Sequence, residues 1–344
     1  MSSIMTYQPE WIREDFVDFI AEKINPMWAW KRAKAAVIAI DALSEDFFKI
    51  QLRPNLNFKA RDLKAGQSIL VTVVIEGVRQ QRSYSVIEQL KNGDVIIAVR
   101  VQGVVSKCLT QMPIHQVIEI SQAQGDFLLD PQDQSRVLIA SGSGITAIYS
   151  LLKQALAQDE SDSHTQMDLI YFTRDRAFHV ELQQLAEQHA HFHYHLIDTA
   201  QTRQHLDLAL LKKITPHFQT ATTYACGAQG MMQSLNQIYA DLNLQDQLKQ
   251  EYFHIQVDEN LPVQDVTFLR SQQQFQADRN LLESAEQAGL RPTHGCRIGI
   301  CNTCTCTKVS GSTKNIITGE IDHGNNTQIK LCVSQAISPV VINL

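Results

Sequence analysis

The stretch Cys296-Arg297-Ile298-Gly299-Ile300-Cys301-Asn302-Thr303-Cys304 determines how the C-terminal part of this chain must fold. Its cysteines follow a C-x4-C-x2-C spacing, and Cys332 stands further on, after residues 305–331. Five of the seven cysteines lie between Cys296 and Cys332, which is unlike the even spread of a secreted disulfide scaffold. This distribution indicates a bound metal in a reducing compartment.

The spacing is that of plant-type [2Fe–2S] ligation, in which four thiolates hold two iron ions. We therefore expect Cys296, Cys301, Cys304 and Cys332 to bind such a cluster, with Gly295 and Gly299 letting the loop approach it closely. A structural zinc site also takes four cysteines, but it usually pairs them as two short hooks, and this chain has one. Two further cysteines, Cys306 and Cys108, are interpreted as structural.

Composition excludes several function classes for this chain of 344 residues. Its formal net charge of −6 gives no broad positive field, so we expect no nucleic-acid partner. Charged residues recur through the first 30 positions, which is unlike a secretory signal, and no apolar run reaches membrane-spanning length. A cytoplasmic protein, with contact to the inner face of a membrane as a further option, is the expectation.

Two different patterns follow one another along the chain. Short apolar runs alternate with turn residues up to about Asp130, at 36–40, 47–52, 68–74, 83–87, 94–101 and 116–120, and predict a small antiparallel barrel. Strands at 137–140 and 168–172 then alternate with helices at 146–155 and 181–189, and predict a doubly wound parallel sheet. A third unit begins with a hairpin (266–270, 273–276) and a helix (280–288).

A flavin-binding pattern lies in the barrel segment. Arg82-Ser83-Tyr84-Ser85 places a cation, an aromatic ring and hydroxyls on one expected strand, with alternate side chains on opposite faces. Arginine neutralises a phosphate, an aromatic ring stacks on isoalloxazine, and a hydroxyl or N–H group reaches flavin N5. Downstream, Gly103-Val104-Val105-Ser106 is a glycine-led turn whose N–H groups suit a phosphate.

A nicotinamide-binding pattern opens the α/β segment. Gly142-Ser143-Gly144-Ile145-Thr146-Ala147 follows a strand and starts a helix, as a glycine-rich phosphate loop must, and we expect Gly142, Ser143, Gly144 and Thr146 to bind the coenzyme. After the next strand, Arg174 and Arg176 suit the 2′-phosphate of NADPH, whereas Asp175 suits the 2′-hydroxyl of NADH. We favour NADPH, with NADH as the alternative.

Another strand-to-loop transition follows residues 222–225. In Cys226-Gly227-Ala228-Gln229-Gly230, small residues would let a flat ring approach the backbone. Cys226 is interpreted as lying against nicotinamide C4, and a buried structural cysteine is the alternative.

Taken in order, these motifs resemble the ferredoxin–NADP reductase superfamily, and specifically reductases with a ferredoxin domain at the C-terminus. The resemblance runs from about Ala35 to the end of the chain. It implies that Arg82 contacts the flavin phosphate, that Tyr84 contacts the flavin and that Ser85 lies near N5, with Ser85 and Cys226 as the catalytic positions. The family often has proline at positions 147 and 228, where this chain has alanine.

The resemblance also implies the architecture and the cofactors. We expect a multidomain protein with an N-terminal amphipathic helical extension (1–34), a flavin-binding antiparallel β-barrel (35–130), an NAD(P)-binding α/β doubly wound domain (131–258) and a β-grasp-like [2Fe–2S] ferredoxin domain (259–344). FAD is the expected flavin, although an FMN-binding branch shares the R-x-Y-S motif.

The implied activity is electron transfer from NAD(P)H through flavin and cluster to a separate oxygenase or desaturase. A membrane-bound fatty-acyl desaturase or alkane or lipid hydroxylase is the first expectation for the acceptor. The alternatives are a soluble ring-hydroxylating dioxygenase or monooxygenase and, from another class, a redox sensor or zinc-stabilised interaction module without turnover.

The N-terminal extension carries Ile12, Phe16, Phe19, Ile20 and Ile24 at helical spacing, together with all three tryptophans, Trp11, Trp28 and Trp30. Pro26 should end this helix. The favoured interpretation is a helix packed on the barrel or on the adjoining domain, and the alternative is a docking surface in residues 1–30 for a membrane or a membrane-bound oxygenase.

One further pattern is weaker. The alternating His189, His191, His193 and His195 are interpreted as the solvated face of a strand.

Overall fold

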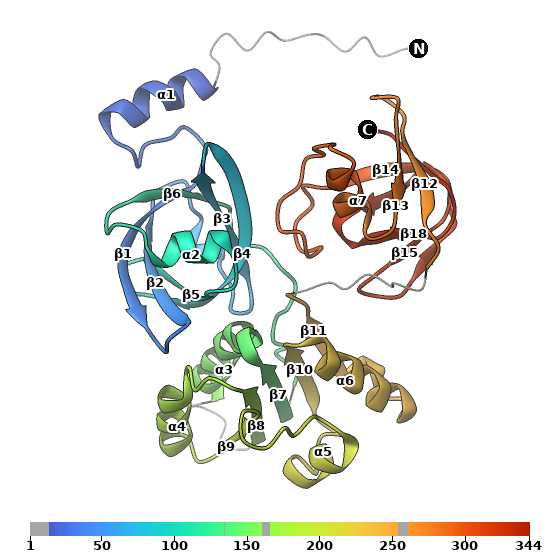
Figure 1. Ribbon diagram of the computed structural model, residues 1–344. Coiled ribbons are helices and arrows are strands. Elements are labelled where there is room, and N and C mark those ends of the chain that lie inside the picture. Colours follow the sequence, from blue (N-terminus) through green and yellow to red (C-terminus); the bar gives the residue numbers. More distant parts are fainter. Residues whose placement is uncertain (1–13, 134, 160–165, 254–260) are drawn as a thin grey trace.

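The computed structural model describes residues 14–133, 135–159, 166–253 and 261–344, and these form three folded units with a short N-terminal helix (Figure 1). Two of the units lie side by side above the third. Within the described ranges, no helix is long and apolar enough to cross a membrane.

The first unit is a closed antiparallel barrel with the strand order β1-β2-β5-β4-β3-β6. Its elements are β1 (Lys34–Ala42), β2 (Phe47–Pro54), η1 (Ala60–Asp62), β3 (Ser68–Ile75), β4 (Val78–Gln89), β5 (Val95–Arg100), α2 (Val104–Thr110) and β6 (Val117–Ile120). The expected six-stranded barrel is confirmed. The strand expected at 83–87 begins earlier, because Glu76 and Gly77 both adopt positive φ and turn β3 directly into β4.

The second unit is a parallel sheet with the order β11-β10-β7-β8-β9. Its elements are β7 (Ser135–Ser141), η2 (Gly142–Gly144), α3 (Ile145–Asp159), β8 (Gln166–Thr173), α4 (His179–Gln188), β9 (Phe192–Asp198), α5 (Leu208–Ile214), β10 (Thr222–Cys226), α6 (Gln229–Asp241), η3 (Gln245–Gln247) and β11 (Leu248–Glu251).

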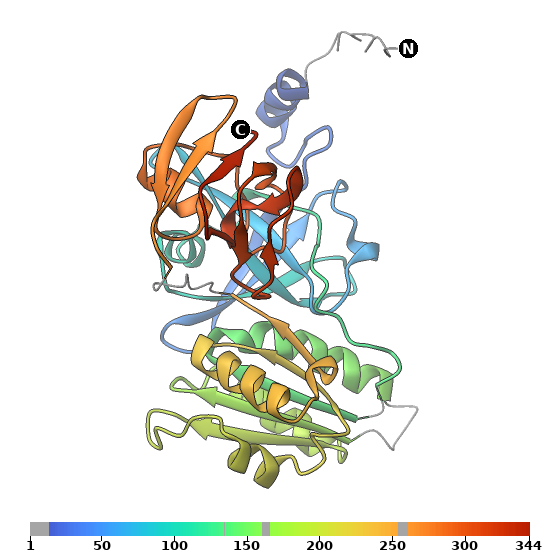
Figure 2. The same cartoon turned by 90° about the vertical axis from the view of Figure 1, so that its right-hand side faces the viewer.

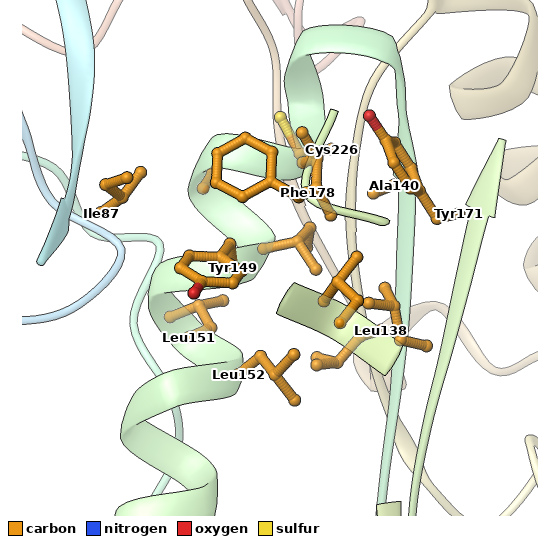
Figure 3. Close-up of a cluster of buried hydrophobic side chains, with 14 of the residues drawn as sticks. Ile87, Leu138, Ala140, Tyr149, Leu151, Leu152, Tyr171, Phe178 and Cys226 are labelled. Atoms are coloured by element: carbon orange, nitrogen blue, oxygen red, sulfur yellow. The ribbon is translucent and has the colours of Figure 1, made fainter. Parts of the chain in front are cut away.

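Helices cover both faces of this sheet, as a doubly wound fold requires. Leu138 packs toward α3 and α4, whereas its neighbours Val137 and Ile139 pack toward α5 and α6, so the continuous apolar run of β7 supplies two cores. Figure 3 shows the first of these cores.

The third unit combines a five-stranded sheet, β13-β12-β19-β14-β17, with a small sheet, β16-β15-β18, and α7 packs against both. Its elements are β12 (Gln264–Phe268), β13 (Gln273–Ala277), α7 (Leu281–Gln287), β14 (Thr305–Ser310), β15 (Thr313–Asn315), β16 (Ile321–Asp322), β17 (Thr327–Lys330), η4 (Leu331–Val333), β18 (Ser334–Ala336) and β19 (Val340–Ile342). Asn280 caps α7 through its side chain, and Gly289 follows the helix with φ of 81°.

The N-terminal helix α1 (Glu14–Ile24) ends before Pro26 as expected and is attached to the barrel, but through its polar side. Its carboxylates, and not its apolar side chains, face the barrel, because Asp18 and Glu22 accept hydrogen bonds from Arg32 and Lys34 beside β1. Trp11 and Ile12 lie outside the described residues.

The expected histidine face also needs correction. His189 ends α4 and His191 precedes β9, so neither belongs to the strand. His193 and His195 do share a face of β9, where both approach the buried Asp168 carboxylate, His195 at 2.8 Å.

The barrel and the α/β unit meet at Gly66, which precedes β3. Its N–H donates to Ser150 Oγ of α3 (2.8 Å), and a side chain there would meet the Phe127 carbonyl oxygen at 1.8 Å. Figure 2 shows the α/β unit on one side of this junction, with the barrel and the C-terminal unit both on the other.

Replacing Gly66 by alanine should therefore destabilise the protein more than the same change at Gly93, which has the same φ of 88° but open space around it. We expect Gly93→Ala to cost about 1 kcal/mol of unfolding free energy from its left-handed backbone. Gly66→Ala should cost a further ~1–3 kcal/mol from overpacking. Urea titration of both variants measures the difference, and equal losses would contradict the proposed close approach.

Candidate functional site

The first cavity, of about 430 Å³, brings together both segments of the expected flavin motif. Its walls include Arg82, Ser83, Tyr84 and Ser85 from β4 and Gly103, Val104, Val105 and Ser106 from the start of α2. Residues about twenty positions apart in the chain thus meet because β4 pairs with β5, which leads into α2.

The charges in this cavity suit an anionic ligand. Burial, together with the nearby guanidinium of Arg297, lowers the pKa of Arg82, although Arg297 is itself paired with Glu286 at 2.5 Å. A flavin phosphate would offset that repulsion. Burial also raises the pKa of Tyr84, whose ring packs on the barrel core and stays uncharged.

The turn before α2 is shaped by Ser106. Its Oγ accepts hydrogen bonds from the N–H groups of Gln102 and Gly103, both at 3.0 Å, and donates to the Gly103 carbonyl. The hydroxyl therefore fixes the backbone of the turn, and the Val104 and Val105 residues of the first helical turn face the cavity.

A second cavity, of about 640 Å³, lies at the carboxyl ends of the parallel strands, where doubly wound folds bind nucleotides. The expected Gly142, Ser143 and Gly227 line it, together with Arg174. Thr146 instead lines the flavin cavity, where its Oγ1 lies 3.3 Å from Ser85 Oγ.

Gly144 and Cys226 are positioned differently from the sequence-based interpretation. Among the described residues, neither lines these two cavities. A Cβ on Gly144 would meet the Cys226 carbonyl oxygen at 2.0 Å, so this glycine lets the loop pack on β10. The Cys226 side chain is fully buried among Ala140, Tyr171 and Phe178 (Figure 3), and burial raises the pKa of its thiol.

The three polar residues after β8 separate in the structure. Arg174 lines the second cavity, whereas Arg176 forms an ion pair with Asp198 at 3.3 Å. The Asp175 carboxylate turns toward the barrel, where it accepts from Ser44 Oγ (2.7 Å) and contacts Asp46. Burial and the Asp46 carboxyl raise the pKa of Asp175.

The four expected cluster ligands are buried together at the edge of the C-terminal unit. Cys304 and Cys332 have their sulfurs 3.3 Å apart, and the Cys296 thiol contacts those of Cys301 and Cys332. Hydrogen bonds from Cys301 and Cys332, and from the N–H groups of Cys301 and Ile298, lower the pKa of Cys296. Four sulfurs held this way fit a metal that binds thiolates.

The loop around these sulfurs leaves little room. Gly299 has φ of 82°, and a Cβ there would meet Val333 at 2.8 Å, while a Cβ on Gly295 would meet Cys301 Sγ at 3.0 Å. Both glycines therefore let the backbone wrap the sulfurs. Cys306 lies in the core of the unit, where burial raises the pKa of its thiol to about 12, and Cys108 packs partly buried on the barrel core.

Comparison with known families matches each unit in turn. Residues 34–128 match the oxidoreductase FAD-binding domain, residues 138–237 the oxidoreductase NAD-binding domain, and residues 266–336 the 2Fe-2S iron-sulfur cluster binding domain. The chain belongs to the ferredoxin–NADP reductase superfamily, with a C-terminal ferredoxin domain. This reductase is an oxidoreductase whose cofactors are FAD, NAD(P) and a [2Fe–2S] cluster, as expected.

Relatives share this arrangement over most of their length. An NADPH oxidoreductase of Mycobacterium tuberculosis is 26% identical over 93% of this chain and 86% of its own. A tetrachlorobenzoquinone reductase of Sphingobium chlorophenolicum is 27% identical over 89% and 96%. The solved structure of phthalate dioxygenase reductase, at 23% identity, superimposes with a TM-score of 0.60 over 90% of this chain and 97% of that one, and so shares its fold.

Two residues of the reductase that the sequence interpretation missed lie at the end of β11. Phe253 lines both cavities and so lies where the flavin position and the nicotinamide position meet. Glu251 pairs with Cys226 across the sheet, is almost wholly buried, and has an oxygen without a hydrogen-bond partner. The sequence of β11, Leu248–Glu251, is mostly polar, so no apolar strand pattern predicted this strand.

Burial raises the pKa of Glu251 from its ordinary 4.5 to about 8. Between these two pH values the folded reductase keeps a proton that the unfolded chain has lost, so stability should fall as pH rises, by up to about 1.4 kcal/mol per pH unit. Glu251→Gln should abolish this contribution, and urea titration from pH 5 to 8 measures it. Glu187→Gln, at an exposed position of α4, is the control, and identical slopes in both variants would contradict the assignment.

Proposed function

We propose that the reductase oxidises NADPH, passes the electrons through FAD and the [2Fe–2S] cluster, and reduces a separate membrane-bound fatty-acyl desaturase or alkane or lipid hydroxylase. This route is supported by residues of the cluster loop that also line the flavin cavity. Cys296 and Ile298 of the cluster loop line the same cavity as Tyr84 and Ser85, and Phe253 lines both this cavity and the next. The nicotinamide, flavin and cluster positions thus follow one another.

Bound flavin accepts the two electrons of a hydride together and releases them singly, which matches a donor of pairs to a one-electron acceptor. The chain's own residues bind and orient. Arg82 would neutralise a flavin phosphate, Ser85 and Thr146 would place hydroxyls beside the reacting ring edge, and Phe253 would exclude water between the two cavities. Gly142 and Ser143 would contact the coenzyme phosphates.

The preference for NADPH rests on the residues after β8. Asp175 accepts hydrogen bonds from Ser44 Oγ and from the Ala177 N–H (2.9 Å), so its carboxylate is already used at the barrel and is turned away from a ribose hydroxyl. Arg174 remains in the cavity wall, where a guanidinium favours a 2′-phosphate. The name of the mycobacterial relative, an NADPH oxidoreductase, agrees with this preference.

Arg174→Ala should raise the KM for NADPH about 10–100-fold, the loss of one charge-assisted contact, and leave the KM for NADH nearly unchanged. Arg176→Ala removes an equal charge from the same loop but from outside the cavity wall, and should change either KM less than about threefold. Steady-state kinetics with both coenzymes measures this. If the two substitutions had equal effects, or if one substitution changed the KM for both coenzymes equally, Arg174 would not be the residue that recognises the 2′-phosphate.

Two classes of acceptor protein are the alternatives for the final electron transfer. A membrane-bound lipid desaturase or hydroxylase, reached from the cytoplasmic face, is favoured by the apolar side chains that α1 turns to solvent, such as Phe16 and Ile24. A soluble ring-hydroxylating dioxygenase or monooxygenase is favoured by the shared fold of phthalate dioxygenase reductase.

Reconstitution separates the two acceptors. Purified reductase and NADPH are combined either with membranes containing a fatty-acyl desaturase or with a purified ring-hydroxylating oxygenase, and NADPH consumption is compared with product formed. We expect coupled product in the first mixture and uncoupled oxidation in the second. Cytochrome c reduction, which needs neither acceptor, reports equal reductase activity in both. Coupled product with the soluble oxygenase alone would overturn the membrane assignment.

A further inference from the structure

Two acidic side chains of α1 bind the segment that leads into the barrel. Asp18, which is fully buried, accepts hydrogen bonds from the Trp30 N–H and from Arg32 Nε, both at 2.6 Å. Glu22 accepts from Lys34 Nζ at 2.7 Å and from Arg32 at 3.0 Å. These bonds join the helix to the chain just before β1 and fix its rotation about its own axis.

The opposite side of α1 consequently points to solvent. Phe16, Phe19, Ile20 and Ile24 are 46–69% exposed, and Trp28 and Trp30 beyond the helix are 54% and 49% exposed. We call these six side chains the outer face. An amphipathic helix of a globular domain normally buries its apolar side, so this orientation is inverted. Exposed aromatic and aliphatic side chains concentrated on one helix and the short segment after it are typical of an interaction surface.

The charged side chains around the outer face indicate which kind of partner it binds. Lys23 lies over the Phe19 ring at 5.5 Å and Lys31 over the Trp30 ring at 5.7 Å, so cations border the apolar surface. The acids Asp18 and Glu22 are turned inward and paired. Tryptophan and phenylalanine with lysine at the edge is the composition of segments that lie in the interface of an anionic bilayer.

The position of α1 is consistent with such a contact. In Figures 1 and 2, α1 and the ferredoxin domain both lie at the end of the molecule opposite the nicotinamide domain. A bilayer in contact with α1 would therefore lie at the end of the molecule that is far from the nicotinamide domain.

We propose that the outer face binds the interfacial region of an anionic lipid bilayer, with the Asp18–Arg32 and Glu22–Lys34 pairs holding it outward. This binding requires neither coenzyme nor acceptor, so it can fail while the electron route from NADPH to the cluster stands, whereas the choice of a membrane-bound acceptor rests on the same outer face. Lys23 and Lys31 supply the attraction to anionic headgroups, and the aromatic and aliphatic side chains supply the apolar burial.

Co-sedimentation of the full-length holoprotein with lipid vesicles tests the proposal. Binding should be strong to vesicles of phosphatidylcholine mixed with phosphatidylglycerol and weaker to phosphatidylcholine alone. The combined change Phe19→Ser, Ile20→Ser and Ile24→Ser should lower the partition coefficient by a factor of about ten or more. The matched control, Val78→Ser, Ile114→Ser and Ile321→Ser, removes three exposed hydrophobic side chains elsewhere and should leave binding unchanged.

A second variant tests the charge requirement. Lys23→Glu with Lys31→Glu should abolish the preference for phosphatidylglycerol while the holoprotein still reduces cytochrome c at the normal rate. Equal binding by all variants, or no binding to either vesicle, overturns the proposal. If vesicles are not bound but the serine variant loses turnover with a membrane acceptor, the outer face binds a protein instead. None of these outcomes alters NADPH oxidation, so they leave the proposed electron route untouched.

Discussion

The contact between the cysteine loop and the barrel is the constraint on which the electron route depends. Leu70 of β3 packs in one buried cluster with Cys296 and Cys301, and Ile298 and Ile300 close around them. This contact fixes the ferredoxin domain against the flavin cavity, because the same loop that holds two cluster ligands also forms a wall of that cavity. Electrons pass efficiently only between centres held close together, so an apolar contact of a few side chains sets the function of the whole chain.

The opposite side of the flavin cavity is fixed by the nicotinamide domain. Ser44 and Asp46 of the barrel meet Asp175, and Arg100 pairs with Asp46 at 3.0 Å. This polar junction lies beside Arg174, so the residues that join two domains also shape the coenzyme site. Phe253, which follows β11, lines both cavities. The flavin cavity is therefore bounded by residues of all three domains.

The N-terminal segment shows how polar contacts can override an apolar pattern. The spacing of its hydrophobic residues predicts a helix whose apolar side packs inward, and the helix is present. Burying that side would require Asp18 and Glu22 to leave Arg32 and Lys34, and an uncompensated buried charge costs more than an exposed phenylalanine or isoleucine. The helix accordingly uses its polar side for attachment and leaves its apolar side available.

Local spacing in the sequence predicted an iron–sulfur cluster, a flavin, a nicotinamide coenzyme and the type of fold, and the family resemblance added the preference for FAD. The C-x4-C-x2-C loop, the alternation of Arg82 to Ser85 and the change from strand-only to strand–helix patterns each lie within a short window, where backbone geometry fixes which groups can act together. Tertiary structure alone decided which candidates reach the cavities. Cys226 turned into the core, and Asp175 turned to a serine 131 residues earlier in the chain. Glu251 was buried beside Cys226, and Phe253, just after the same mostly polar strand, reached both cavities. Those outcomes depend on which surfaces pack together across distant parts of the chain, and no local window of residues contains that information.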